Sequence, residues 1–245
     1  MSSDVLMAED KWVEQKSGHF VFYYKNAPKD FAKTVEQMAE SYYDEIARNL
    51  DAHRFNPGAN LERCKIYIYD DGEDYVEKGK LMQWSHGVAS VRTRTIHTFP
   101  MAHGFFDSTL PHELGHIIFR DVIGQEIDVP QWFEEGVAMQ QEKAKRFGAD
   151  EAVQGAMKSG TFFSLGKLSD VQLTTKTDPD VVNLFYAESA SVIRFMLNEY
   201  GQQRFNMLCQ KLKEGMAFES ALYNSYYRFK TIDDLSKVWE NYLKQ

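Results

Sequence analysis

The 245-residue sequence has no apolar run that approaches the length of a membrane span. A spanning helix needs about 18 to 20 consecutive apolar residues. The first residues, MSSDVLMAEDKW, also lack the basic start and the apolar core of a signal peptide. We therefore expect either a cytoplasmic protein or the mature form of an exported one whose leader has been removed.

Cysteine and positive charge are scarce as well. The two cysteines, Cys64 and Cys209, fall in a strand-like and a helix-like run, and we expect both to be buried apolar residues rather than a disulfide. The 36 acidic residues outnumber the 28 basic ones, which gives a net charge of −8. Nucleic acids and anionic membranes both attract basic surfaces, so neither is expected to be the main partner.

The apolar content of 43% is that of a globular protein with a substantial core. Hydrophobic periodicity predicts strands at 19–25 and 63–70, a strand pair within 84–99, helices at 30–50, 109–119 and 130–147, and nearly continuous helix from about 180. Strands and helices followed by helices alone favour an α+β fold. We expect one domain, with a sheet-bearing lobe over about 1–124 and a helical lobe over about 125–245.

The segment TLPHELGHIIF, residues 109–119, carries the main chemical signal. Pro111 fits the first turn of a helix, and Asp107 or Ser108 can cap its start. The helix has an apolar stripe on one side, formed by Leu110, Leu114 and Ile117. The polar side chains of the segment should therefore point the other way.

His112 and His116 are four residues apart, which places them about 40° apart around a helix and roughly 6 Å apart along it. Two imidazoles at this spacing can bind one zinc ion together. Glu113 is rotated by about 100° from His112, so it can reach a water on the ion and act as general base. The alternative is a solvated helix face that carries histidines without a metal.

A third ligand is available further along the chain at Glu135. Eighteen residues separate it from His116, enough for a loop containing Gly124 and Pro130 and a second helix that returns antiparallel. Gly136 costs up to about 1 kcal/mol of helix stability relative to alanine. We interpret it as the residue that lets the two helices approach closely around a shared ion.

HELGH, eighteen residues and then the glutamate of WFEEGVA resembles the gluzincin metallopeptidases. The pattern is similar to the aminopeptidase N type and, more closely, to small bacterial peptidase MA-like proteins. The resemblance implies a zincin-like α+β fold, in which a lobe with a small sheet and the HExxH helix faces a helical lobe across a cleft. It also implies one Zn²⁺ per chain, held by His112, His116 and Glu135, with Glu113 as general base and Tyr186 as stabiliser of the oxyanion.

Two glutamates near the motif have open interpretations. Glu134 stands where the aminopeptidase N relatives have asparagine, and it can be surface charge or a hydrogen-bond partner of a ligand histidine. Glu142, two turns after Glu135, can orient a ligand or lie on a solvated face. The glutamate with which aminopeptidases bind a free amine is absent from HGVASVRTRT, so an endopeptidase or an unassigned peptidase fits better.

Other candidates also have two interpretations. Tyr186, Ala190, Ile193 and Leu197 form a helical stripe that could be core, whereas Trp132 is expected to pack.

The segment 87–96 could bind an extended peptide as an added strand, or could simply be a protected sheet edge. The histidines upstream of the motif could approach a cleft or be ordinary satisfied residues: His86, His97 and His103.

The sequence therefore predicts a zinc peptidase that hydrolyses peptides or proteins with a metal-activated water. One alternative is an inactive metal-binding or partner-binding module on the same fold. It is disfavoured because a purely structural site does not need Glu113. The other alternative is a metal-dependent hydrolase of a non-peptide amide, and the sequence says little for or against it.

Overall fold

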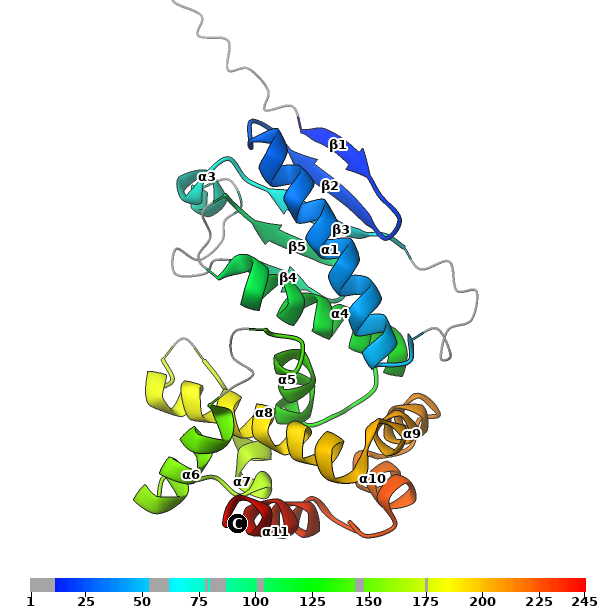
Figure 1. The fold of residues 1–245 in the computed structure, drawn as a ribbon, viewed down its shortest axis with the longest axis vertical. Helices are drawn as coiled ribbons and strands as arrows, with labels where there is room; N and C mark the ends of the chain where they lie inside the picture. The colour runs from blue at the N-terminus through cyan, green and yellow to red at the C-terminus, as the bar shows by residue number, and fades with distance from the viewer. Residues whose placement is uncertain are drawn as a thin grey trace, which may run out of the picture. The chain divides into compact units, whose positions relative to one another are not determined.

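A computed structural model describes residues 12–52, 62–77, 79, 87–100, 104–143, 148–174 and 176–245. Five strands and a larger set of helices make up this part of the chain. The α+β class predicted from the order of strands and helices is confirmed, with the sheet in the N-terminal half and helices in the C-terminal half (Figure 1).

The sheet has the strand order β1-β2-β3-β5-β4. Its strands are β1 (Val13–Lys16), β2 (Phe20–Tyr24), β3 (Cys64–Ile68), β4 (Gly87–Ser90) and β5 (Thr95–Thr98). Strands β2, β3 and β5 are parallel, and the two outer strands pair antiparallel. The predicted strands at 19–25 and 63–70 are confirmed, and so is the strand pair with β4 at an edge. Strand β1 was not predicted, because its VEQK sequence carries little apolar signal.

Helix α1 (Lys29–Asn49) begins against this sheet. Glu36 accepts a hydrogen bond from the Gln15 side chain, and Glu40 accepts one of 2.9 Å from the backbone N–H of His19. Fully buried apolar side chains fill the sheet and the facing stripe of the helix: Phe20, Ile66, Ile96, Val35 and Ala39. The 3.6-residue period of α1 and the alternation of β3 thus build one core.

The other helices are α3 (Gly72–Glu77), α4 (Leu110–Ile123), α5 (Gln131–Met139), α6 (Ala149–Ser159), α7 (Leu165–Asp170), α8 (Pro179–Tyr200), α9 (Gln202–Lys213), α10 (Phe218–Tyr226) and α11 (Ile232–Leu243). A short π-helical turn, η1 (Phe105–Thr109), precedes α4. Among the described helices, none combines the length and the apolar character that crossing a bilayer requires.

Two compact units can be distinguished by their internal contacts. The first contains the described residues up to Ser41 and those from 62 to Phe106. The second contains the end of α1 and the chain from Asp107 onward, so α4 is grouped with the helices. That the whole chain forms a single domain stays a prediction.

Several local expectations are wrong. The helix predicted over 130–147 ends at Met139. Neither Asp107 nor Ser108 caps α4; its N-cap is Thr109, which makes no side-chain cap hydrogen bond, because η1 leads directly into the helix. Helices α3, α6 and α7 were not predicted. Cys64 and Cys209 are buried, as expected.

Helix α5 lies between α4 and α8 within the second unit (Figure 1). A Cβ added at Gly115 of α4 would lie 3.0 Å from the Cα of Ala138 in α5. A Cβ at Gly136 would lie 2.5 Å from Cγ1 of Ile193 in α8, and even closer to the carbonyl oxygen of Ser189. Gly136 was expected to allow the approach of α4. The structure corrects this: Gly115 allows it, and Gly136 faces α8.

We expect Gly136→Ala to lower the free energy of unfolding by about 2 kcal/mol or more, because the new methyl group overlaps the backbone of α8. Chemical denaturation measures the change. The matched control is Gly155→Ala in α6, where the added Cβ meets nothing within 4 Å. That variant should gain up to about 1 kcal/mol from helix propensity. Equal stability of the two variants would contradict the proposed helix contact.

Candidate metal centre

His112 and His116 lie one turn apart on α4, with their ring centroids 4.8 Å apart. Both side chains are largely buried, with 15% and 12% of their surface exposed. Their Nε2 atoms are separated by 3.1 Å. Two imidazole nitrogens this close repel through their lone pairs unless a proton or a cation lies between them. The geometry therefore calls for either a shared proton or a bound cation between the two rings.

Glu135 of α5 reaches the same point. Its Oε2 lies 3.4 Å from Nε2 of His112 and 3.3 Å from Nε2 of His116. Among the described residues, these three side chains form a group that could hold a metal ion. The structure thus brings together the three residues that the sequence had picked out as ligands.

The spacing of the three atoms fits a small divalent cation. Zinc bonds of 2.0 to 2.2 Å in tetrahedral geometry place ligand atoms about 3.3 Å apart. The three separations at this centre are 3.1, 3.3 and 3.4 Å. In addition, Oε2 of Glu135 is buried and has no hydrogen-bond partner among the described residues. A buried oxygen of this kind is costly unless an ion or a water satisfies it.

The electrostatics of the centre also favour positive charge. Burial alone would raise the pKa of the Glu135 carboxyl, but interaction with His112 and His116 lowers this pKa to about 2. Burial alone would lower the pKa of His116, but the carboxylates of Glu134 and Glu135 raise this pKa to about 10. Glu135 therefore stays negatively charged, as a carboxylate ligand must be, and the carboxylates around His116 stabilise a positive charge at this point.

Glu113 follows His112 on α4 and stands outside the ligand group. Helix geometry rotates it by about 100° from His112. Burial raises the pKa of its carboxyl above the ordinary value, although the two histidines oppose the change. Glu113 is thus a half-buried carboxyl group outside the candidate ligand group, and its role as general base stays a prediction.

Glu142 contacts the far side of His112. Its Oε1 lies 2.8 Å from Nδ1 of His112, and its Oε2 accepts a hydrogen bond from the Ser108 hydroxyl. Only 2% of the Glu142 side chain is exposed. Of the two interpretations that the sequence left open, the solvated helix face is therefore wrong, because Glu142 is buried against His112.

Glu134 lies on the far side of His116. Its carboxylate accepts hydrogen bonds from Nε and Nη2 of Arg120, and Oε1 lies 3.6 Å from Nδ1 of His116. Arg120 also donates to the carbonyl oxygen of Ile127 at 2.6 Å. With 18% of its side chain exposed, Glu134 is not plain surface charge, which was one of the two interpretations left open by the sequence.

The sequence analysis missed Arg120 and considered Ser108 only as a possible helix cap. Both could have been found from the spacing of four that also relates the histidines: 108, 112, 116 and 120. Residues at this spacing lie on one face of a helix. The hydroxyl and the guanidinium at the ends of this row each hold a carboxylate against the centre.

Tyr186 of α8 lies beside His112, with ring centroids 6.4 Å apart. It also packs against a buried cluster of Met139, Ala149 and Ala190. Burial, followed by the nearby carboxylates, raises the pKa of Tyr186, so its hydroxyl stays protonated and can donate a hydrogen bond. The packing of Tyr186 therefore agrees with a role in the core, and its position near His112 agrees with a catalytic role.

Other sequence candidates have simpler outcomes. Trp132 is fully buried, as expected, and donates to the Ser169 hydroxyl. His97 stacks on Tyr67 and lies 3.2 Å from the Tyr69 hydroxyl, which supports the interpretation as a satisfied residue.

His86 and His103 lie outside the described residues. The segment 87–96 contains the edge strand β4, and its role in substrate binding stays a prediction.

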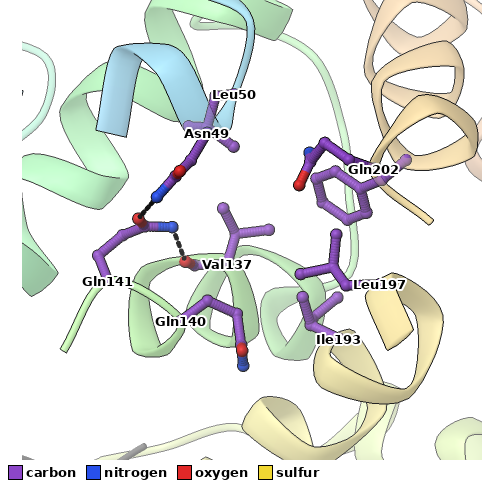
Figure 2. Close-up of a pocket in the computed structure, with 9 residues that line it drawn as sticks. Asn49, Leu50, Val137, Gln140, Gln141, Ile193, Leu197 and Gln202 are labelled. Atoms are coloured by element: carbon purple, nitrogen blue, oxygen red, sulfur yellow. Dashed lines mark hydrogen bonds between the residues drawn. The ribbon is translucent and has the colours of Figure 1, made fainter. Parts of the chain in front are cut away.

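A cavity of about 140 Å³ lies beside α5 (Figure 2). Its wall includes Val137, which is rotated by about 200° from Glu135 around the helix axis. The lining is aliphatic, aromatic or amide, and Figure 2 shows Asn49 donating to Gln141, which donates to the Val137 carbonyl. With no titratable side chain in its wall, this cavity is not the chemical centre.

Comparison with known families gives one finding. The family model described as the Peptidase MA superfamily matches residues 44–245, a range that contains every residue of the metal centre. No curated protein matches the chain.

We expect the purified chain to bind one zinc ion, and Glu135→Ala to weaken this binding by about a hundredfold or more, since losing a direct ligand should exceed the 10- to 100-fold cost of losing an outer partner. Competition with a fluorescent chelator measures the affinity. The exposed Glu151→Ala in α6 serves as the control and should bind like wild type. Equal affinity of both variants would remove Glu135 from the ligand set.

Proposed function

This chain belongs to the Peptidase MA superfamily, and on that premise we propose that it is a zinc-dependent peptidase of the gluzincin type. Membership of this superfamily supports peptide-bond hydrolysis as the reaction class. The observation that carries the zinc proposal is the convergence of two Nε2 atoms and one carboxylate oxygen within 3.1 to 3.4 Å of one another. A glutamate as third ligand defines the gluzincin type.

His112, His116 and Glu135 would hold the ion. When bound, zinc supplies a Lewis acid that polarises a carbonyl group and lowers the pKa of a water. The two histidines come from α4 and the glutamate from α5, so their relative positions depend on how these helices pack. Three protein ligands leave one position open for chemistry, as catalytic zinc sites do.

Glu113 is the proposed general base. It accepts a proton from the attacking water while the water oxygen bonds to the carbonyl carbon. The carbon–nitrogen bond then breaks, and Glu113 passes the proton to the leaving amine. Its place beside His112 but outside the ligand group supports this role, because a carboxylate bound to the ion could not carry the proton as freely.

Tyr186 is the proposed donor to the oxyanion that forms on the carbonyl oxygen. A donor placed for the transition state lowers the barrier more than it helps substrate binding. The position of its ring next to His112 supports the role. The substrate would be a peptide or a protein, as the superfamily implies.

We expect Glu113→Gln to lower the cleavage of a broad peptide mixture by about a hundredfold or more, the usual effect of losing a general base, while zinc content stays at the wild-type level. Mass spectrometry of the products and metal analysis measure the two quantities. The control is Glu126→Gln, an exposed carboxylate in the loop after α4.

Cleavage that survives Glu113→Gln would refute the mechanism. Zinc binding with no cleavage by the wild type would favour a metal-binding module, and hydrolysis of only non-peptide amides would favour that class of hydrolase.

Tyr186→Phe should lower kcat by more than about tenfold without a matching change in KM, because the hydroxyl acts on the transition state. Steady-state kinetics on the best peptide of the mixture measure both constants. Tyr200→Phe, on the same helix, is the matched control: its hydroxyl accepts a hydrogen bond from Arg228 and should not affect turnover. An unchanged kcat for Tyr186→Phe would assign this residue to the core.

A further inference from the structure

We propose that the protonated carboxyl group of Glu188 anchors the segment 160–164 to α8, and that loss of this proton to solvent releases the segment. Glu188 lies on α8, and the segment joins α6 to α7 (Figure 1). All three helices belong to the second unit of the chain. The inference does not depend on the proposed function, because Glu188 is not one of the candidate metal ligands.

Glu188 is a carboxyl group with no exposed surface. Its Oε1 accepts a hydrogen bond of 2.9 Å from the backbone N–H of Phe163, in the segment. Its Oε2 is buried and has no hydrogen-bond partner in the described part of the chain. A buried carboxylate needs a cation or several donors to replace its lost hydration. One N–H replaces only part of it, so the neutral acid is the favoured form.

The other buried acidic side chains of the described residues have the compensation that Glu188 lacks. Asp74 lies 3.5 Å from the ammonium nitrogen of Lys25. Glu142 accepts from the Ser108 hydroxyl and lies 2.8 Å from Nδ1 of His112. Glu188 is therefore the buried acid for which ionisation is most costly.

Helices α5, α6, α9 and α11 pack against α8, but none of their charged groups forms an ion pair with Glu188 or shifts its pKa. The charged groups of these helices that are not exposed have other partners: Glu134 and Glu135 at the metal centre, Asp150 with Arg194, Arg204 with the Ser225 carbonyl, Lys211 with Glu214, Asp234 with Thr231, and Glu240 with Ser236. Lys167 and Asp170 of α7 are exposed.

The surroundings of Glu188 set the pH at which its proton is lost. Burial raises the pKa of the Glu188 carboxyl from about 4.5 to about 8, although the Phe163 N–H opposes the change. Between these two values the unfolded chain has lost the proton and the folded chain keeps it. The folded form therefore becomes less stable as the pH rises from about 4.5 to about 8, and the loss levels off above that.

The segment 160–164 is the part of these surroundings that can open to let water reach an ionised Glu188. It is the stretch between α6 and α7, outside regular structure apart from the two helix caps at its ends. Its attachments are few: the Phe163 N–H on Glu188 and the Phe162 ring, 5.4 Å from that of Trp239 in α11. Segments with few buried contacts open at a lower cost than packed helices do.

Release of the segment would act on a helix that the metal centre uses. Tyr186 lies two residues before Glu188 on α8. The next residue, Ser189, has its carbonyl oxygen against Gly136 of α5. The proton on Glu188 therefore stabilises the packing of α8 on the side opposite the segment as well.

The first test measures the folding equilibrium constants of wild type and Glu188→Gln by urea denaturation of the full chain from about pH 5 to about pH 9. Glutamine keeps an acceptor for the Phe163 N–H and has no proton to lose. We expect the constant of the wild type, divided by that of the variant, to fall by about tenfold per pH unit up to about pH 8 and then to level off. A ratio that does not change with pH would overturn the proposal.

The matched control is Glu199→Gln, the same substitution at an exposed position of the same helix. Its folding constant relative to the wild type should not vary with pH. A fall like that expected for Glu188→Gln would trace the effect to loss of any glutamate of α8 and would also overturn the proposal.

The second test detects release of the segment. Trp239 donates its indole N–H to the Ser191 hydroxyl of α8 and packs on Phe162, so this N–H reports on the junction. Its NMR signal, assigned with Trp239→Phe, should shift with a midpoint near pH 8 in the wild type and stay constant in Glu188→Gln. Above this pH, the Phe163 amide should exchange with solvent faster in the wild type than in the variant.

A Trp239 signal and a Phe163 exchange rate that are alike in the two proteins would mean that Glu188 titrates without moving the segment, which would refute the release. Should Glu188→Gln fail to fold, the titration of the wild type decides alone: a Trp239 signal that is constant across pH 8 contradicts the proposal. Neither test uses zinc or a peptide, so a failure of the proposed function would leave both results valid.

Discussion

The metal centre depends on how closely α4 and α5 approach each other. Gly115 lies between the two histidines in sequence, and a Cβ there would come within 3.0 Å of the Ala138 backbone and 3.1 Å of the Gln141 side chain. An alanine there would require these neighbours to shift by a few tenths of an ångström, and a longer side chain would require a larger shift of α5, which carries Glu135. Because the ligand atoms must stay about 3.3 Å apart to share a zinc ion, an opening of even 1 Å would remove one ligand.

A second close approach holds α5 from behind. Gly136 lets α8 contact the helix backbone at Ser189, and the rings of Trp132 and Phe133 pack edge-on against Phe218. These contacts hold in place the helix that carries Glu135, the proposed third ligand, and a residue on a loop would lack such support. The same helix α8 also brings Tyr186 beside His112. Helix α8 thus helps to position both the proposed ligand Glu135 and the proposed oxyanion donor Tyr186.

Periodicity was enough to predict the long elements, and spacing was enough to select three side chains that the fold brings together. Helices α1, α4 and α8 repeat their apolar residues strongly, and the spacing of His112, His116 and Glu135 limits the chemistry by itself. What remained unpredicted depends on tertiary contacts. The polar strand β1 forms because β2 offers it a partner, and Glu142 meets His112 because α5 ends earlier than its sequence pattern suggests. The partner of Gly136 was misassigned for the same reason, since periodicity does not tell which neighbour a face meets.

The charges around the centre make a case for a cation that does not depend on any motif. Two histidines are surrounded by four carboxylates, those of Glu113, Glu134, Glu135 and Glu142. Arg120 pairs with the carboxylate of Glu134. Buried carboxylates are costly unless a positive charge or hydrogen bonds satisfy them. Serine and histidine donors satisfy Glu142, but Oε2 of Glu135 is directed at two ring nitrogens without a hydrogen bond from the described residues. A divalent cation would satisfy this oxygen and both ring nitrogens together, and without the ion a protonated His116 would pair with the same oxygen.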